Sequence, residues 1–387
     1  MISVTDNCTV YVGDCVESLR TMPDKSVNCC VTSPPYWGLR DYGTARWEGG
    51  SAECDHRNGP LASPKSTLQG YTGPNVKLAV GGMPYRDTCG KCGAIRVDGQ
   101  LGLEKRPEEY VAKMVEVFRE VRRVLRDDGT LWLNLGDSYA ANGKQDNGGH
   151  KGLSAASERC DGVPRNSANK ANQNGTVANT VRTMPLGLKP KDIVGIPWRV
   201  AFALQADGWY LRQDIIWAKP NPMPESVTDR CTKSHEYIFL LSKSAKYFYD
   251  ADAVKELQVT SGNGGFSNKK TLKSVVYNEG HKPSLVNATN DGFRNRRSVW
   301  HISTRPYKGA HFATFPPALI EPCIKAGCTV GGTVLDPFGG SGTTGRVASD
   351  LGRKAILCEL NTNYVELIKQ RLTEPAKPVK KRKKVAV

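Results

Sequence analysis

Apolar residues along the chain fall into short blocks typical of buried strands and into helix-spaced series typical of amphipathic helices. Residues 27–32 form a short apolar run that ends in Ser-Pro-Pro, which predicts a buried strand leading into a loop. From residue 107 to residue 125 the apolar positions recur at helical spacing, and Asp-Gly at 128–129 predicts the end of that helix. Residues 130–135 are again an apolar run. This part of the chain therefore predicts a strand, a helix and a second buried strand.

A second series of elements follows in the later half of the chain. The pattern predicts a helix at 197–206 and strands at 210–217 and 236–241. The last third alternates regularly, with a helix at 317–326, a strand at 333–336, a helix at 343–351, a strand at 354–359 and a helix at 364–372. Alternating strands and helices predict an α/β fold with a parallel sheet and helices on both faces.

Stretches of low apolar content interrupt this core. Residues 44–100 are rich in Gly, Pro and polar residues, and we interpret them as an insertion. The composition of 140–194 predicts a flexible loop, and 259–308 form a basic region. Residues 375–387 form a basic tail with almost nothing to bury, which predicts disorder. The core that remains consists of residues 1–43 with 101–139, 195–258 and 309–374.

The composition adds a strong positive charge to this picture. The 387 residues include 54 Lys and Arg against 38 Asp and Glu, a formal net charge of +16, while the hydrophobic fraction of 39% is ordinary for a folded protein. A folded and basic chain indicates a polyanionic partner such as nucleic acid. A merely soluble basic protein would have the same composition, so charge alone leaves both interpretations open.

Neither a membrane span nor a secretion signal is expected. No apolar run reaches about 18 residues, and the first residues lack the basic and apolar regions of a signal peptide. Twelve cysteines without such a signal indicate reduced thiols or metal ligands, not a disulfide framework. We therefore expect a cytoplasmic protein.

The segment Asp-Pro-Phe-Gly-Gly-Ser-Gly at 336–342 joins a predicted strand to the next helix. Glycines at such a turn let backbone N–H groups approach a ligand at the helix N-terminus. Asp336, at the end of the strand, is positioned to bind a positively charged group. Glu359 ends the next strand about 20 residues on, the usual position of a carboxylate that binds ribose hydroxyls.

Two ligand classes fit this turn. Gly340, Gly342 and Gly345 match the pattern Gly-x-Gly-x-x-Gly, which makes an NAD-dependent oxidoreductase one interpretation. Asp336, which precedes the glycines, favours the second class, a ligand with a methionine moiety. Its carboxylate would pair with the ammonium group of that moiety, whereas it would repel the pyrophosphate of NAD.

The tetrapeptide Ser33-Pro34-Pro35-Tyr36 has the groups that methyl transfer to an exocyclic amine requires. The lone pair of such a nitrogen is delocalised into the base, and two acceptors for its protons draw the nitrogen toward tetrahedral geometry. The hydroxyl of Ser33 and the carbonyl of Pro34 can supply these acceptors. The prolines stiffen the loop, and Tyr36 offers a ring on which an extruded base can stack. Taken alone, Ser-Pro-Pro is also a common turn.

Residues 31–36 resemble the catalytic signature of DNA amino-methyltransferases, and residues 336–342 resemble the S-adenosylmethionine motif of the same enzymes. The catalytic loop precedes the donor motif, an order similar to that of the circularly permuted β-class. The resemblance implies a Rossmann-like methyltransferase core that binds S-adenosylmethionine and double-stranded DNA and acts on a flipped base. The site residues that it implies are, for catalysis, Ser33, Pro34, Pro35 and Tyr36 and, for the cofactor, Asp14, Phe315, Asp336, Phe338, Gly339, Gly340, Ser341, Gly342 and Glu359.

The resemblance leaves the target base and the biological setting open. Ser-Pro-Pro-Tyr, in place of Asp-Pro-Pro-Tyr, is more similar to the cytosine-N4 branch than to the adenine-N6 branch, and an RNA substrate stays within the same class. Such bacterial or phage-encoded enzymes belong to restriction–modification systems or act alone, so a homodimer and a cognate restriction endonuclease are open as partners. Pro322-Cys323 matches the nucleophile of cytosine-C5 methylation, but it lies in a predicted helix, which favours a structural cysteine.

Two pairs of metal-binding side chains lie in the insertion at 44–100. Cys54-x-His56 and Cys89-x-x-Cys92 supply the four ligands that a tetrahedral zinc ion requires. A structural zinc would also explain how a segment poor in apolar residues folds. The long gap between the pairs leaves open that they are unrelated.

Candidate DNA contacts lie after the strand at 210–217 and in the basic region. Trp217 and Lys219 belong to a segment similar to the one that packs beside the flipped base in the family. Arg294, Arg296 and Arg297 can bind phosphate or read guanine edges. A zinc-containing DNA-binding protein without enzymatic activity is the second alternative.

Overall fold

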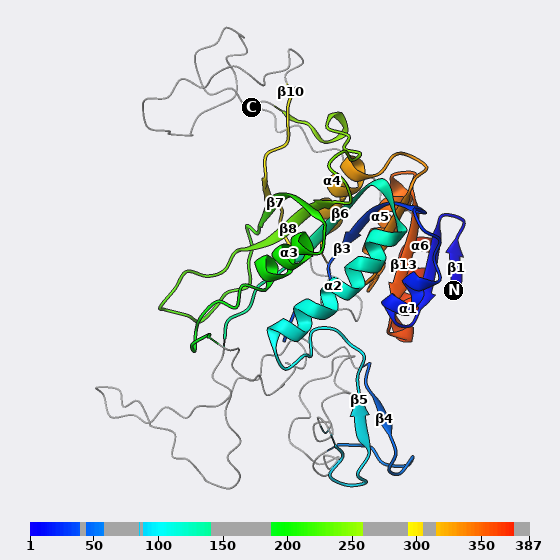
Figure 1. Cartoon of the computed structure of the whole chain (residues 1–387), viewed down its shortest axis with the longest axis vertical. Helices are drawn as coiled ribbons and strands as arrows, with labels where there is room; N and C mark the ends of the chain where they lie inside the picture. Colours follow the sequence, from blue (N-terminus) through cyan, green and yellow to red (C-terminus); the bar gives the residue numbers. More distant parts are fainter. Residues whose placement is uncertain are drawn as a thin grey trace.

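Among the residues that the structure describes, one sheet of nine strands forms the centre of the molecule (Figure 1). The computed structural model describes residues 1–38, 44–57, 85, 88–140, 187–257, 293–304 and 315–374. In their order across the sheet, the strands are β1 (Ile2–Thr5), β2 (Cys8–Val12), β13 (Lys354–Glu359), β12 (Thr333–Asp336), β3 (Val27–Thr32), β6 (Leu125–Leu135), β8 (His235–Ser242), β7 (Tyr210–Ala218) and β11 (Val299–His301).

The sheet is mixed, not wholly parallel as the alternating pattern predicts. β2, β13, β12, β3 and β6 run parallel to one another, and β11 runs parallel to β7. β8 lies antiparallel between β6 and β7, and β1 is antiparallel to β2. Antiparallel neighbours need no helical crossover, and residues 219–234 between β7 and β8 contain no helix. The prediction of a parallel sheet is therefore wrong for β8, and β1, which the pattern does not predict, is also antiparallel.

Helices cover both faces of the sheet, as predicted. The described helices are α1 (Cys15–Arg20), α2 (Pro107–Val124) and α3 (Ile196–Ala206) on one face and α4 (Pro317–Gly327), α5 (Thr343–Asp350) and α6 (Thr362–Thr373) on the other. Side chains of β3 alternate between the two cores: Cys30 packs in the core with α2, and Cys29 and Val31 pack in the core with α4. The central strands are thus buried on both sides.

The boundaries of most elements agree with the apolar pattern. β3, β12 and β13 have the predicted bounds, and α2 differs by one residue at its end. β6 is longer than predicted, because it begins at Leu125 directly after α2. Leu125 has an extended backbone and pairs with Val27 of β3. Asp-Gly at 128–129 consequently lies inside a strand and does not end the helix.

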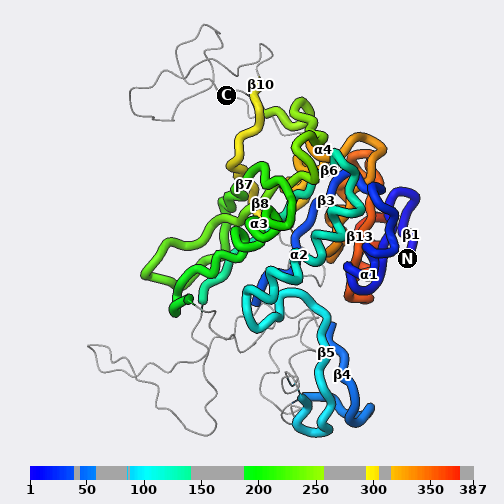
Figure 2. Tube along the Cα trace, viewed as in Figure 1, coloured from blue at the N-terminus to red at the C-terminus, as the bar shows by residue number. Residues whose placement is uncertain are grey.

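The first and last parts of the chain lie side by side in the sheet. β2 pairs in parallel with β13, from Cys8 opposite Ala355 to Val12 opposite Glu359. Figure 2 shows the N-terminal strands, in blue, beside the red C-terminal segment. The apolar pattern does not predict the short elements β1, β2 and α1. Because β2 pairs with β13, the residues after β2 lie next to the predicted cofactor-binding part of the core, residues 309–374.

Two short antiparallel pairs lie outside the large sheet. β4 (Arg46–Glu48) pairs with β5 (Ile95–Val97) in the predicted insertion, and this ribbon projects away from the sheet (Figure 1). β9 (Glu256–Leu257), which follows the 3-10 helix η2 (Asp252–Val254), pairs with β10 (Phe293–Arg294).

Several predicted segments lie largely outside the described residues. These are the loop at 140–194, of which 141–186 are not described, the tail at 375–387, and 258–292 and 305–314 around the basic region. None of the described helices has the length and apolar content of a membrane span.

Candidate active site and metal centre

The polar residues of the predicted site gather at one edge of the sheet, where the parallel strands end. Asp14 follows β2, Glu359 ends β13, Asp336 ends β12 and Ser33 follows β3. β12 and β3 are direct neighbours. The glycine-rich donor turn at 337–342 and the Ser-Pro-Pro-Tyr loop therefore begin next to each other. Open α/β sheets bind their ligands outside this edge.

Asp336 ties the catalytic loop to the donor turn. Its Oδ1 accepts hydrogen bonds from Thr32 Oγ1 at 2.6 Å and from the Phe338 N–H at 3.0 Å, and its Oδ2 accepts one from Thr344 Oγ1 at 2.6 Å. The residue is 1% exposed, and burial raises the pKa of its carboxyl group. This geometry differs from the predicted contact with a cofactor ammonium group. The enclosed carboxylate instead orders the two loops that face the ligand edge.

The donor turn is organised around the carboxylate of Glu359. One oxygen accepts a hydrogen bond from the N–H of Gly340 at 2.7 Å, and the other accepts from the N–H of Asn361 at 2.8 Å. Gly340 has a left-handed backbone with φ 51°, and a Cβ on Gly339 would lie 3.0 Å from Cβ of Leu357. Burial raises the pKa of Glu359 to about 7. Because a buried carboxylate gains from additional O–H donors, its position fits the ribose hydroxyls of a nucleoside.

Asp14 lies beside this turn. The N–H of Gly13 donates to the Glu359 carbonyl at 2.9 Å, which holds the end of β2 against the end of β13. Oδ1 of Asp14 accepts from the N–H groups of Val16 and Glu17 at 2.8 and 3.0 Å and so caps α1. Asp14, one of the predicted cofactor residues, is therefore oriented by the start of its own helix.

The other predicted cofactor residues support the same turn. Arg371 donates to the Ser341 hydroxyl at 2.6 Å, and Ser341 is 3% exposed, so this hydroxyl is engaged within the protein. Gly342 is the N-cap residue of α5. Phe338 packs beside the core that contains α2, and Phe315 packs beside the core that contains α4.

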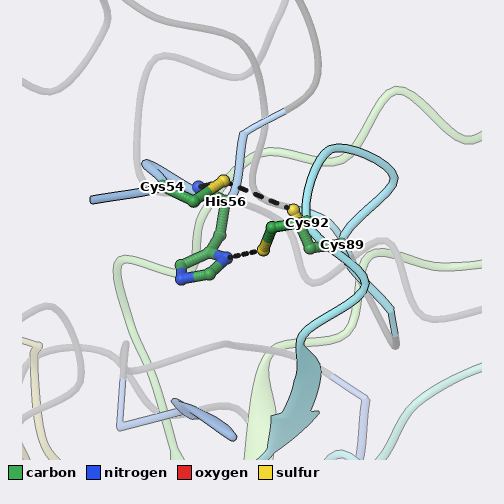
Figure 3. Close-up of side chains that lie close together, drawn as sticks. All are labelled: Cys54, His56, Cys89 and Cys92. Carbon is green, nitrogen blue, oxygen red and sulfur yellow. Dashed lines mark hydrogen bonds between the residues drawn. The ribbon is translucent and has the colours of Figure 1, made fainter. Parts of the chain in front are cut away.

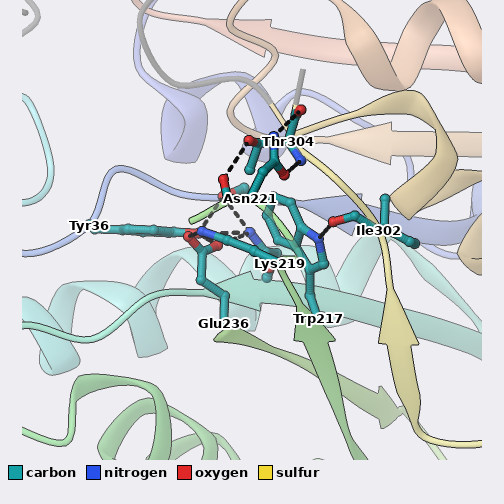
Figure 4. A network of polar contacts seen from close by, with 9 residues as sticks. Tyr36, Trp217, Lys219, Asn221, Glu236, Ile302 and Thr304 are labelled. Atoms are coloured by element: carbon teal, nitrogen blue, oxygen red, sulfur yellow. Dashed lines mark hydrogen bonds and ion pairs between the residues drawn. The ribbon is translucent and has the colours of Figure 1, made fainter. Parts of the chain in front are cut away.

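Ser33 and Tyr36 belong to a hydrogen-bonded network that includes Glu236. Figure 4 shows Tyr36 and Glu236 within this network. The Ser33 hydroxyl donates to Tyr36 Oη at 3.3 Å, and the Tyr36 hydroxyl donates to Glu236 Oε2 at 2.7 Å. The side-chain amide of Asn134 donates to the same three residues, at 2.7 Å to Tyr36, 3.1 Å to Glu236 and 3.3 Å to Ser33. Burial, followed by the charge of Glu236, raises the pKa of Tyr36 well above its usual value. The phenol therefore keeps its proton.

The sequence patterns do not single out Asn134 or Glu236. Asn134 is 5% exposed and stands in the apolar run of β6, while Glu236 is the second residue of the largely buried β8. A polar side chain inside a buried strand requires a partner. That signal is present in the sequence, but it does not name the partner.

The catalytic loop is anchored by the helix that follows the insertion. Tyr110 of α2 donates its hydroxyl to the Pro35 carbonyl at 2.9 Å, and Pro34 is buried. A Cβ on Gly136, just after β6, would lie 2.6 Å from Cε2 of Tyr36, so one side of the Tyr36 ring packs against this backbone. The loop is thus held from both neighbouring elements.

Trp217 and Lys219 approach the same network from the end of β7 (Figure 4). Lys219 Nζ pairs with Glu236 Oε1 and lies 4.5 Å from the centre of the Trp217 ring. Trp217 is 3% exposed, and its indole N–H donates to the Ile302 carbonyl at 2.7 Å. The structure therefore joins Lys219 to the catalytic loop. Direct contact of either residue with DNA stays a prediction.

Arg294 is the second residue of β10, and Arg296 and Arg297 follow this strand. Arg294 and Arg297 donate from Nε to the same oxygen of Glu256, at 2.9 and 2.7 Å. The guanidinium carbon of Arg296 lies 4.6 Å from the centre of the Trp300 ring. Arg297 has the more open position, with 67% of its side chain exposed. Their contact with DNA also stays a prediction.

Cys54, His56, Cys89 and Cys92 come together at the end of the β4–β5 ribbon (Figure 3). Their potential ligand atoms all lie within 4.8 Å of one another. Cys54 Sγ lies 3.7 Å from Cys89 Sγ, and Cys92 Sγ lies 3.5 Å from His56 Nδ1. In a tetrahedron with zinc–sulfur bonds of about 2.3 Å, neighbouring ligand atoms are separated by about 3.8 Å. The spacing of the four groups fits that geometry.

The surroundings of Cys92 favour its thiolate form. Backbone hydrogen bonds to Ala94 and Ser51 lower the pKa of the Cys92 thiol to about 6. The His56 ring stacks on Trp47 of β4, with ring centres 4.5 Å apart. Thiolates and a packed imidazole are the donors of a structural zinc site. The two pairs, distant in sequence, are therefore related in space.

Cys323 has the environment of a core residue. It is 1% exposed inside α4, and burial raises the pKa of its thiol. A nucleophile for cytosine-C5 chemistry would need an accessible, acidic thiol. The structural interpretation of this cysteine is confirmed.

Comparison with known proteins agrees with this site. A family model described as DNA methylase, of N6 and N4 type, matches residues 27–370. The Type II methyltransferase M.Cfr9I of Citrobacter freundii is 40% identical over 368 residues, which cover 95% of this chain and 88% of the relative. The Type II methyltransferase M.SmaI of Serratia marcescens is 40% identical over 367 residues, covering 95% and 91%.

A solved structure supports the fold. The PvuII DNA methyltransferase, described as cytosine-N4-specific, superposes with a TM-score of 0.52 and 18% identity, covering 96% of this chain and 89% of that one. The matched interval of the family model includes both the Ser-Pro-Pro-Tyr loop and the donor turn. The chain thus belongs to the N6/N4 DNA methylase family.

Proposed function

We propose that the protein transfers the methyl group of S-adenosylmethionine to the exocyclic amino group of a base flipped out of double-stranded DNA. One observation carries this proposal: the Thr32–Asp336 hydrogen bond holds the Ser-Pro-Pro-Tyr loop beside the glycine turn at the ends of β3 and β12. Membership of the DNA methylase family supports the class of reaction. Such proximity of the two loops is what a direct transfer between two bound reactants requires.

The chain's own groups bind the cofactor and orient the amine. The turn at Gly340 and the carboxylates of Glu359 and Asp14 would hold the nucleoside part of S-adenosylmethionine, which supplies a methyl group on a positively charged sulfur. The Ser33 hydroxyl and the Pro34 carbonyl accept the amino protons and free the nitrogen lone pair. The base is stacked and kept away from water, a role that suits the anchored ring of Tyr36.

Cytosine N4 is our favoured target within this class. The serine that opens Ser-Pro-Pro-Tyr supports it, because the first acceptor is then a neutral hydroxyl in place of the aspartate typical of adenine-N6 enzymes. The likeness of the fold to a cytosine-N4-specific enzyme points in the same direction without deciding the base. Adenine N6 is the alternative.

We assign target recognition to residues 259–308 and the two halves of the core to catalysis and cofactor binding. The exposed Arg297 and the basic composition of this region support a DNA-facing role. The Type II designation of the relatives supports a place in a restriction–modification system, with a cognate endonuclease as the partner activity.

We also propose one structural zinc ion bound by Cys54, His56, Cys89 and Cys92. The spacing of the ligand atoms supports it, and so does the half-buried or exposed character of the side chains along β4 and β5. Zinc would take no part in methyl transfer, because the cluster lies on the ribbon that projects from the sheet.

Transfer of labelled methyl groups to unmethylated DNA tests the proposed function. We expect incorporation, with Tyr36→Ala lowering the transfer rate far more than cofactor binding. Asp336→Ala should abolish both methyl transfer and cofactor binding, since it removes the hydrogen bond that holds the two loops together. Glu321→Gln, on the exposed side of α4, is the matched control and should behave as the wild type. Mass analysis of the product nucleosides distinguishes N4-methylcytosine from N6-methyladenine. A folded protein that labels no DNA of varied sequence would refute the proposal.

A further inference from the structure

A directed chain of hydrogen bonds leads from the catalytic serine to a carboxylate. Ser33 donates to Tyr36 Oη at 3.3 Å, and Tyr36 donates to Glu236 Oε2 at 2.7 Å. Each hydroxyl gives its one proton to the next group, and the Ser33 oxygen, which also accepts from Asn134, keeps one lone pair for the substrate. Glu236, which can only accept when ionised, ends the chain.

The proposed reaction produces a proton that must leave the amine. The nitrogen lone pair forms the new N–C bond, while the C–S bond breaks and its electrons remain on sulfur. The product nitrogen is then positively charged until one N–H proton departs. Of the two groups proposed to accept the amine protons, the Ser33 oxygen is the one that is hydrogen-bonded to Tyr36.

We infer that Glu236 is the terminal acceptor of the proton released from the methylated amine, through Ser33 and Tyr36. The amine proton passes to the Ser33 oxygen as Ser33 gives its own proton to Tyr36 and Tyr36 gives its own to Glu236. One N–H bond breaks, one carboxyl O–H bond forms, and both hydroxyls are restored. This inference rests on the proposed function, because it needs an amine substrate at Ser33.

The surroundings of Glu236 suit this role. Lys219 pairs with Oε1, which leaves Oε2 toward Tyr36. The Glu236 side chain is 16% exposed, so the proton can pass to water after each turnover. The titratable groups that face the carboxylate are Tyr36 after β3, Lys219 after β7, and His235 and Lys233 at the start of β8.

Tyr36 has the properties needed to pass a proton from Ser33 to Glu236. Burial and the neighbouring carboxylate keep the phenol protonated, so it can receive a proton only while it gives one away. Asn134 donates to both Ser33 and Tyr36 and thereby fixes the two hydroxyls as donors toward Glu236. Glu236 touches no substrate and acts through Tyr36, which makes it a positioning residue with a proton-accepting role.

Glu236→Gln isolates this role, because an amide oxygen still accepts the Tyr36 hydrogen bond but does not take up its proton. We expect the single-turnover methyl transfer rate to fall about 100-fold, the lower range for lost proton transfer, with unchanged dissociation constants for S-adenosylmethionine and DNA. The decline of the wild-type rate toward acid pH should be absent in the variant. Glu366→Gln removes an equally lysine-paired glutamate on α6 and should have no effect.

A double-mutant cycle with Tyr36→Phe completes the test. Tyr36→Phe keeps the ring but breaks the chain, so the double variant should be no slower than the slower single variant. Tyr36→Phe also decides the question if Glu236→Gln fails to fold. Wild-type rates and an unchanged pH profile in either folded variant would overturn the inference. Absence of methyl transfer by the wild type would instead refute the proposed function.

Discussion

Three carboxylates at the ligand edge of the sheet have different roles because their hydrogen-bond donors differ. Asp336 is enclosed by two threonine hydroxyls and one N–H group, so it joins two loops. Glu359 accepts backbone N–H groups of the donor turn and is 8% exposed. Glu236 accepts from a tyrosine and pairs with a lysine. Residue type alone therefore does not indicate what each acid does.

The raised pKa of Glu359 predicts a pH dependence of cofactor binding. Burial raises this pKa from 4.5 to about 7, so the group's contribution to the free energy of unfolding is full below about pH 4.5 and is lost as the pH rises through 7. Ribose hydroxyls donate to the ionised form, so cofactor binding favours loss of the proton. We expect the affinity for S-adenosylmethionine to increase roughly tenfold between about pH 5 and about pH 8, measured by calorimetry.

Glu359→Gln should remove this dependence and weaken cofactor binding, because the amide keeps its charge state at every pH. Glu366→Gln on the exposed face of α6 serves as its control and should retain the wild-type profile. Equal pH dependence in wild type and Glu359→Gln would contradict the assignment of this carboxylate to the ribose.

At the level of elements, the core and the insertion are stabilised in different ways. α2 covers its face of the sheet with a stripe that includes fully buried Tyr110, Met114 and Phe118, so its position follows from apolar burial. The β4–β5 ribbon has three residue pairs and half-buried or exposed side chains along both strands. A ribbon of this size needs an additional source of stability.

Removal of zinc should therefore unfold the ribbon and leave the core folded. We expect one zinc ion per chain by elemental analysis, and loss of hydrogen-exchange protection in β4 and β5 after chelation, with protection in β3 and β12 unchanged. Cys92→Ser should reproduce the effect of the chelator. Cys231→Ser, which changes an exposed free thiol, is the matched control. A purified chain without zinc that protects β4 and β5 would disprove the metal site.

At the level of the whole molecule, the topology brings the candidate catalytic and cofactor groups to one edge of the sheet. The ends of the parallel strands, the Ser-Pro-Pro-Tyr loop and the segment that continues β11 all lie at the ligand edge of the sheet. The net charge of +16 adds a general attraction for phosphate. Electrostatic attraction would hold the DNA near the protein, and specific contacts at this edge would form afterwards.

This arrangement predicts a steep salt dependence of DNA binding. The logarithm of the association constant should fall linearly with the logarithm of the salt concentration, and Arg297→Ala should reduce the slope by about one. Arg126→Ala removes an exposed arginine that is paired with Asp128 at the start of β6, outside the predicted DNA-binding region, and should leave the slope unchanged. Fluorescence anisotropy with one duplex at several salt concentrations measures both. Equal slopes for all three proteins would rule out a phosphate contact by Arg297.

The sequence by itself determined the elements whose signals are local. The bounds of β3, β12 and β13 follow from short apolar runs between glycines and prolines, and the donor turn follows from its glycines. The candidate metal ligands Cys89 and Cys92 are also recognisable, because Cys-x-x-Cys is a local motif. These features depend on neighbours in sequence, so a pattern can reveal them.

Only the tertiary structure decided the direction of β8, the enclosure of Asp336 and the network around Tyr36. Tyr36 and Glu236 are 200 residues apart in sequence, and Thr32 and Asp336 are 304 apart. Such contacts form because strands distant in the chain become neighbours in one sheet, and a linear pattern does not contain that pairing. The sequence therefore indicated which loops carry the chemistry, while the fold decided which side chains surround them.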